Sequence, residues 1–109
     1  MSSLIDVAVQ HFSSLSVREV PIPEWDTTCY AKNLTLEDKA KLSSRSNNDW
    51  QEYMVYAIIF GLVDQAGDPV FTIKDKAKLL RFTSPAIIER IASVILSHQS
   101  ETEEDREKN

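Results

Sequence analysis

The stretch DWQEYMVYAIIFGLVDQAGDPVF, residues 49–71, decides the fold of this chain. Asp49 is placed to cap a helix, and Glu52 three residues later forms a partial capping box with it. Apolar residues then fill most faces of the helix, which is typical of a helix buried on several sides. Its uncharged run of roughly 11 residues is too short to span a bilayer, which takes about 20. The pattern predicts a buried central helix over residues 49–64, ended by a turn containing glycine and proline.

The composition is that of one ordinary globular domain. The chain has 109 residues, 42% hydrophobic and 27% charged, which is enough for a single modest core. Two glycines and four prolines are too few for the turns of an all-β protein. We therefore predict a mainly α fold with a small N-terminal β-hairpin (α+β), as a compact helical domain around the central buried helix.

The charge and cysteine content limit the partners and the compartment. The net charge is −5, and residues 101–109 carry five acids and two bases. An acidic chain lacks the cationic footprint of general nucleic-acid binding. The single Cys29 cannot form an internal disulfide, and no secretion signal is visible at the N-terminus. We expect an intracellular protein that binds neither nucleic acid nor membrane.

Apolar periodicity and capping residues divide the rest of the chain into elements. The expected organisation is an amphipathic N-terminal helix over residues 1–15, a single globular domain over 16–98 and a disordered acidic tail over 99–109. Within the domain we expect a hairpin over 17–33, helices over about 35–44, 49–64, 73–82 and 85–98, and a loop over 43–48.

The N-terminal helix and the hairpin both have apolar surface that needs a partner. Leu4, Ile5, Ala8, Val9 and Phe12 fall on one face of the helix. The favoured interpretation is that this face lies against the core, and the alternative is a docking helix that binds another protein. An isolated hairpin also needs a surface to pack on, which the helices or a partner must provide.

No catalytic constellation is visible in the sequence. His11 and His98 are separated and flanked by polar residues, so both are predicted to lie on the surface. Cys29 has no CxxC partner and is predicted to be a buried or half-buried strand thiol. Zinc needs three or four convergent ligands, and no glycine-rich phosphate loop is present. We predict a protein that is not an enzyme and has no metal or cofactor.

A basic cluster and two tryptophans are candidate binding sites. Lys74, Lys76, Lys78 and Arg81 lie in a helix–turn–helix-like region, but the second helix is mostly isoleucine, so a solvated face is the favoured interpretation. A small DNA-binding regulator is therefore kept only as an alternative function. Tryptophans are enriched at interface hot spots. Trp50 is predicted mainly to cap one end of the core, whereas core packing and partner contact are balanced for Trp25.

The order of several short motifs resembles the tail assembly chaperones of long-tailed phages. The motifs are VPIPEW (20–25), TCYAKNLTLEDK (28–39), the apolar helix (50–63), VDQAGDPVFTIKDKAKLL (63–80) and SPAIIERIASVIL (84–96). The resemblance covers about residues 17–97 and depends on order and spacing rather than on any one motif. It does not account for the N-terminal helix.

The resemblance implies a non-catalytic phage or prophage protein that acts in the host cytoplasm and is absent from the mature virion. Such chaperones bind the tape measure protein, keep it soluble and recruit tail tube protein during tail morphogenesis. We also expect self-association into homo-oligomers by a head-to-tail contact. An unrelated protein-interaction adaptor is the remaining alternative.

The candidate partner-binding residues are apolar side chains of the N-terminal helix, the hairpin and the connector after the central helix. They are Leu4, Ile5, Val9, Phe12, Ile22, Trp25, Tyr30 and Phe71.

Overall fold

The computed structural model describes residues 3–108, and side chains up to residue 98. In chain order the elements are α1 (Leu4–Ser14), β1 (Arg18–Ile22), the 3-10 turn η1 (Pro23–Trp25), β2 (Thr27–Ala31), α2 (Leu36–Ser46), α3 (Trp50–Gly61), β3 (Leu62–Val63), the 3-10 turn η2 (Ile73–Asp75), α4 (Lys76–Arg81) and α5 (Pro85–Lys108). The predicted mainly α fold with an N-terminal hairpin is confirmed.

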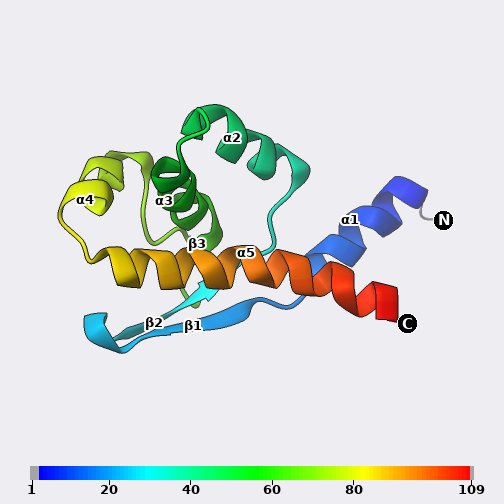
Figure 1. The fold of residues 1–109 in the computed structure, drawn as a ribbon. Helices are drawn as coiled ribbons and strands as arrows, with labels where there is room; N and C mark the ends of the chain where they lie inside the picture. The colour runs from blue at the N-terminus through cyan, green and yellow to red at the C-terminus, as the bar shows by residue number, and fades with distance from the viewer. Residues whose placement is uncertain (1–2, 109) are drawn as a thin grey trace.

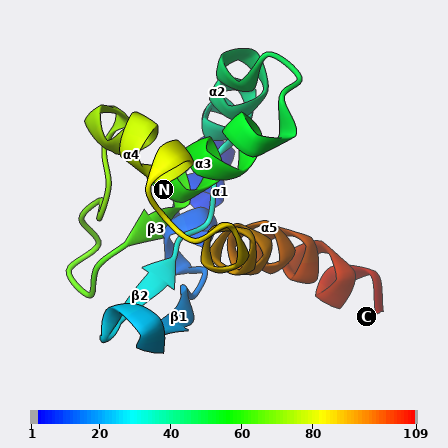
Figure 2. The same ribbon diagram turned by 60° about the vertical axis from the view of Figure 1, so that its left-hand side comes forward.

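Helix α3 is the centre of the core, as its apolar sequence predicts. It packs against α2, α4 and α5, while the N-terminal half of α5 also contacts β1 and β2. In both ribbon views α5 runs between the helices α2, α3 and α4 on one side and the hairpin on the other (Figures 1 and 2). Ile58 of α3 and Ile91 and Ile95 of α5 are fully buried. Two helices far apart in sequence therefore share one core.

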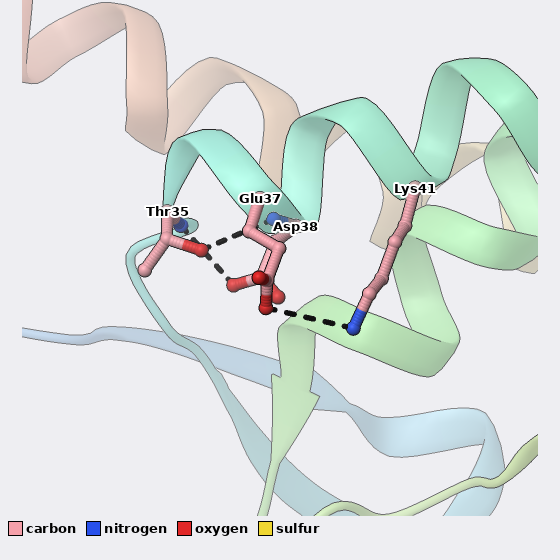
Figure 3. Close-up of polar contacts among 4 residues, drawn as sticks. All are labelled: Thr35, Glu37, Asp38 and Lys41. Atoms are coloured by element: carbon pink, nitrogen blue, oxygen red, sulfur yellow. Dashed lines mark hydrogen bonds and ion pairs between the residues drawn. The ribbon is translucent and has the colours of Figure 1, made fainter.

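Helix starts follow the capping residues expected from the sequence. Asp49 Oδ1 accepts a hydrogen bond from the backbone N–H of Glu52 at 3.1 Å. At the start of α2, Thr35 Oγ1 accepts from the N–H of Asp38, and Asp38 Oδ2 accepts from the N–H of Thr35, both at 3.1 Å (Figure 3). Reciprocal bonds of this kind satisfy two donors that the helix itself leaves unpaired. Lys41 and Glu37 add an ion pair one turn apart (Figure 3).

The sheet is antiparallel with the strand order β1-β2-β3. Val20 pairs with Cys29 in the hairpin, and alternate residues of β1 are buried, as a half-buried strand requires. Strand β3 is an element that the sequence did not predict. Its Leu62 pairs with Ala31 of β2 and is fully buried. A strand of two residues is too short to show an alternation of apolar and polar residues in the sequence.

Gly61 and Gly67 have different structural roles. A Cβ atom at Gly61 would lie 2.7 Å from Cγ2 of Ile95, so glycine allows α5 to approach the end of α3 closely. Gly67 has φ of +92° in the turn after β3. Asp64 Oδ1 closes this turn by accepting from the N–H groups of Ala66 and Asp68.

Several helix boundaries differ from the prediction. Helix α2 continues to Ser46, into the loop expected over 43–48, and α3 ends at Gly61 because β3 begins at Leu62. The helix expected over residues 73–82 is a 3-10 turn followed by the short α4. Helix α5 continues to Lys108 instead of ending near residue 98 before a disordered tail. The added segment is rich in Glu, Lys and Arg, which favour helix, and it contains no Gly or Pro to end one.

Candidate partner-binding surfaces

Helix α1 has an apolar face that nothing in the described chain covers. The helix has no buried residue, and Leu4, Ile5 and Val9 are 82%, 68% and 62% exposed. Figure 1 shows α1 projecting beyond the rest of the molecule, at the end opposite α4. The favoured prediction, that this face lies against the core, is therefore wrong. The face is available for a partner.

The other predicted contact residues lie in different places. Ile22 is fully buried, with 0% of its surface exposed, so its assignment to a partner surface is wrong and it belongs to the core. Trp25 and Phe71 are half-buried and contact each other edge to face, with ring centroids 6.2 Å apart. Tyr30 is half-buried on β2. The structure thus brings Trp25 and Phe71 together at the hairpin tip but leaves them apart from the α1 face.

A two-point ion pair joins the hairpin tip to α5. Arg90 donates from Nη1 and Nη2 to the two carboxylate oxygens of Glu24, at 2.8 and 2.6 Å. These hydrogen bonds lower the pKa of Glu24 to about 2, with a smaller contribution from a backbone hydrogen bond. Arg90 thereby holds η1, and Trp25 within it, against the body of the protein.

We expect the stabilisation from this pair to depend on pH. Because the pKa of Glu24 in the folded chain, about 2, lies below its ordinary value of 4.5, the contribution is present above pH 4.5 and is lost as the pH falls towards 2. Glu24→Gln should therefore be less stable than the native chain at neutral pH, and the difference should shrink on acidification. Urea denaturation of both proteins across this range measures it.

Glu37→Gln is the matched control, because Glu37 makes only an exposed ion pair with Lys41, which contributes little. A stability difference for Glu24→Gln that is constant from neutral pH to pH 2 would contradict the assignment.

Three exposed apolar side chains were not predicted as surface features. Trp50 is 59% exposed and stacks on Tyr53, with ring centroids 5.7 Å apart, so its predicted role as a core cap is wrong. Phe82 directly follows α4 and is 79% exposed, and Leu80 is 39% exposed. The only sequence signal for Phe82 is its position just before the Thr-Ser-Pro break that ends the helix.

A hollow of about 300 Å³ lies where α3, α4 and α5 meet. Met54, Leu79, Leu80 and Ile88 contribute most of its apolar lining. Residues 72–82, which include α4, carry four bases and one acid, a net charge of +3. The charged residue in the lining of the hollow is Glu89.

Three other ionisable side chains, Cys29, His98 and Lys76, are either buried or paired with a neighbouring residue. Cys29 is buried, as predicted, and this burial, followed by the charge of Asp64, raises the pKa of its thiol. His98 is also buried, so the prediction of a surface histidine is wrong for this residue. Lys76 of the basic cluster pairs with Glu52 and lies over the ring of Tyr56.

Within the described side chains, no group of three or more His, Cys, Asp or Glu is arranged to hold a metal ion. The helices in the described part of the chain are too short or too polar to cross a membrane.

The fold is similar to that of a phage tail assembly chaperone of known structure. No protein-family model matches the chain, and no curated protein sequence matches it. Among solved structures, the tail assembly chaperone of bacteriophage HK97 is similar, with a TM-score of 0.57 and 17% sequence identity. The match covers 84% of this chain and 94% of that one. The fold is therefore that of a tail assembly chaperone, as the resemblance in the sequence implied.

Proposed function

We propose that this chain is a non-catalytic chaperone of phage tail assembly, which binds the tape measure protein and brings tail tube subunits to it. The observation that carries the proposal is the uncovered apolar face of α1 on a chain with a tail assembly chaperone fold. A folded domain that presents such a face can cover apolar stripes on a long helical client. In this proposal the protein acts in the host cytoplasm and is left out of the mature virion.

The chemistry of α1 supports a helical client. Ile5, Val9 and Phe12 follow the spacing of one helical face, which is how amphipathic helices bind an apolar surface. The polar face holds Asp6 and Gln10, so the helix remains compatible with water on its other side. Monomeric proteins rarely expose contiguous apolar patches unless they bind something there.

Co-expression with the tape measure protein of the same phage tests the proposal. We expect the tape measure protein to remain soluble with the native chain and to precipitate without it. Val9→Asp places a charge in the centre of the α1 face and should reduce the soluble fraction at least several-fold. The measurement is the amount of tape measure protein in the soluble fraction and its co-elution with the chaperone.

Gln10→Asp is the matched control, because it adds the same charge to the opposite face of the same helix. Equal loss of soluble client with both variants would contradict a role for the apolar face. A tape measure protein that stays equally soluble without the chain would overturn the proposed function.

A further inference from the structure

The surface around Trp50 is hollowed on both sides. One hollow, of about 270 Å³, lies between the C-terminal part of α2 and the start of α3, and its lining includes Asp49, Trp50 and Tyr53. A second, of about 750 Å³, lies between α3 and α5, and its lining includes Trp50, Met54 and Glu89. Met54 and Glu89 also line the hollow where α3, α4 and α5 meet. Because neighbouring hollows share lining residues, they adjoin, and we call them together the Trp50 groove.

Trp50 presents an open aromatic face to this groove. Its ring stacks on Tyr53, with centroids 5.7 Å apart and an angle of 13° between the ring planes. Tyr53 thus covers one face of the indole, whereas the 59% exposure of Trp50 leaves the other face accessible. Among aromatic side chains, tryptophan is the best partner for a cation placed over its ring. The open face of Trp50 therefore suits a Lys or Arg side chain.

The charge that the groove presents to a ligand is negative. Asp49 lies in the first hollow and Glu89 in the other two. Arg90 also lines the groove, but its Nη1 and Nη2 atoms both donate to the carboxylate of Glu24. Within the described side chains, Glu89 makes no ion pair. Two carboxylates beside an open aromatic ring complement a basic ligand.

Helix α3 already holds a lysine by such an arrangement about one turn further along. Glu52 and Tyr56 are four residues apart, and Lys76 pairs with Glu52 and lies 5.0 Å from the centroid of the Tyr56 ring. Asp49 and Tyr53 have the same spacing at the start of the helix, which places them on one face. Within the described side chains, no Lys or Arg occupies this earlier position.

We propose that the Trp50 groove binds a basic, amphipathic segment of another protein. One Lys or Arg of that segment lies over Trp50 and pairs with Asp49, another pairs with Glu89, and its apolar side chains pack on Met54. The α1 helix of a second copy does not have this chemistry, because residues 1–17 contain no Lys or Arg. The site is separate from the α1 face and goes beyond the proposed function.

A designed peptide serves as the probe. It is a helix of about 18 residues with Leu and Lys on one face and Ala and Gln elsewhere. Calorimetric titration into the full-length chain should show saturable binding that weakens as salt is raised. A peptide with Glu in place of Lys, and one with Ala in place of Leu, should each bind at least about tenfold more weakly, because the first repels the carboxylates and the second lacks the apolar contact.

Substitutions in the groove locate the binding. Trp50→Ala should weaken it by about tenfold, as for an aromatic hot spot. Asp49→Asn keeps an N-cap of similar quality, and it and Glu89→Gln should each weaken binding by about two- to fivefold. Phe82→Ala and Glu37→Gln are the matched controls, because they remove an exposed ring and an exposed charge that do not line the groove. Circular dichroism and thermal melting confirm that each variant is folded.

Equal weakening by Glu37→Gln and Asp49→Asn would show general attraction to a chain of net charge −5, and would overturn the proposal. Unchanged binding by Trp50→Ala, or no binding of the Lys peptide to the native chain, would also overturn it. Self-association that is lost in Trp50→Ala, measured by sedimentation velocity, would assign the groove to a second copy instead. Val9→Asp should bind the peptide as the native chain does, so failure here is separate from failure of the proposed function.

Discussion

Replacing Ile58 with alanine is expected to lower the free energy of unfolding by about 2–5 kcal/mol, the usual cost of emptying a fully buried aliphatic position. Ile58 has 0% exposure and lies in α3, the helix that α2, α4 and α5 all pack against. Because domains of this size are stable by only about 5–15 kcal/mol, the change would remove a large part of the total. Urea denaturation followed by circular dichroism measures it.

Ile73→Ala provides the comparison, since Ile73 lies in η2 and is 45% exposed. We expect a change within about 0.5 kcal/mol there, as for most surface substitutions. Equal effects at the two positions would show that α3 is not the centre of the core.

Gly61→Val is expected to destabilise the protein by about 1–3 kcal/mol, because it overpacks the contact between α3 and α5. The new Cβ would lie 2.7 Å from Cγ2 of Ile95, which is itself fully buried and has little room to move. Helix propensity acts in the opposite direction, since glycine costs up to about 1 kcal/mol relative to better helix formers. The packing cost is the larger effect. Thermal and urea denaturation both report the net change.

A double-mutant cycle separates overpacking from other causes. Ile95→Leu removes the Cγ2 methyl group that meets position 61 and keeps the side-chain volume, so on its own it should cost less than about 1.5 kcal/mol. Gly61→Ala should lower the free energy of unfolding by less in the Ile95→Leu chain than in the native chain. Additive effects of the two changes would contradict a direct contact between these positions.

Local signals in the sequence predicted most of the fold. Thr35 and Asp49 mark the starts of α2 and α3 because each satisfies a backbone donor that any helix leaves open. Strand β3 was missed because Leu62 belongs to a two-residue strand whose only support is its pairing with β2. The exposure of Trp50 was missed for a related reason. Spacing places it on a helix face, but whether another element covers the first turn depends on tertiary packing.

The candidate site was predictable only in part. An amphipathic pattern identifies an apolar face, as for Val9 on α1, but it does not say whether the same chain or another covers that face. Ile22 and Trp25 are both apolar residues of the hairpin region, yet the side chain of Ile22 in β1 is buried in the core and Trp25 lies at the hairpin tip. The Glu24–Arg90 pair joins residues 66 positions apart, a separation that no local pattern can predict.

The prolines of the sheet have a consequence for aggregation. Pro21 lies in the edge strand β1, and Pro69 forms the isolated bridge to Val63 on the outer side of β3. Proline has no N–H to donate, so neither side of the sheet offers an uninterrupted row of donors to an incoming strand. The chain thus exposes the apolar face of α1, whereas the edges of its sheet are protected against amyloid-like strand addition.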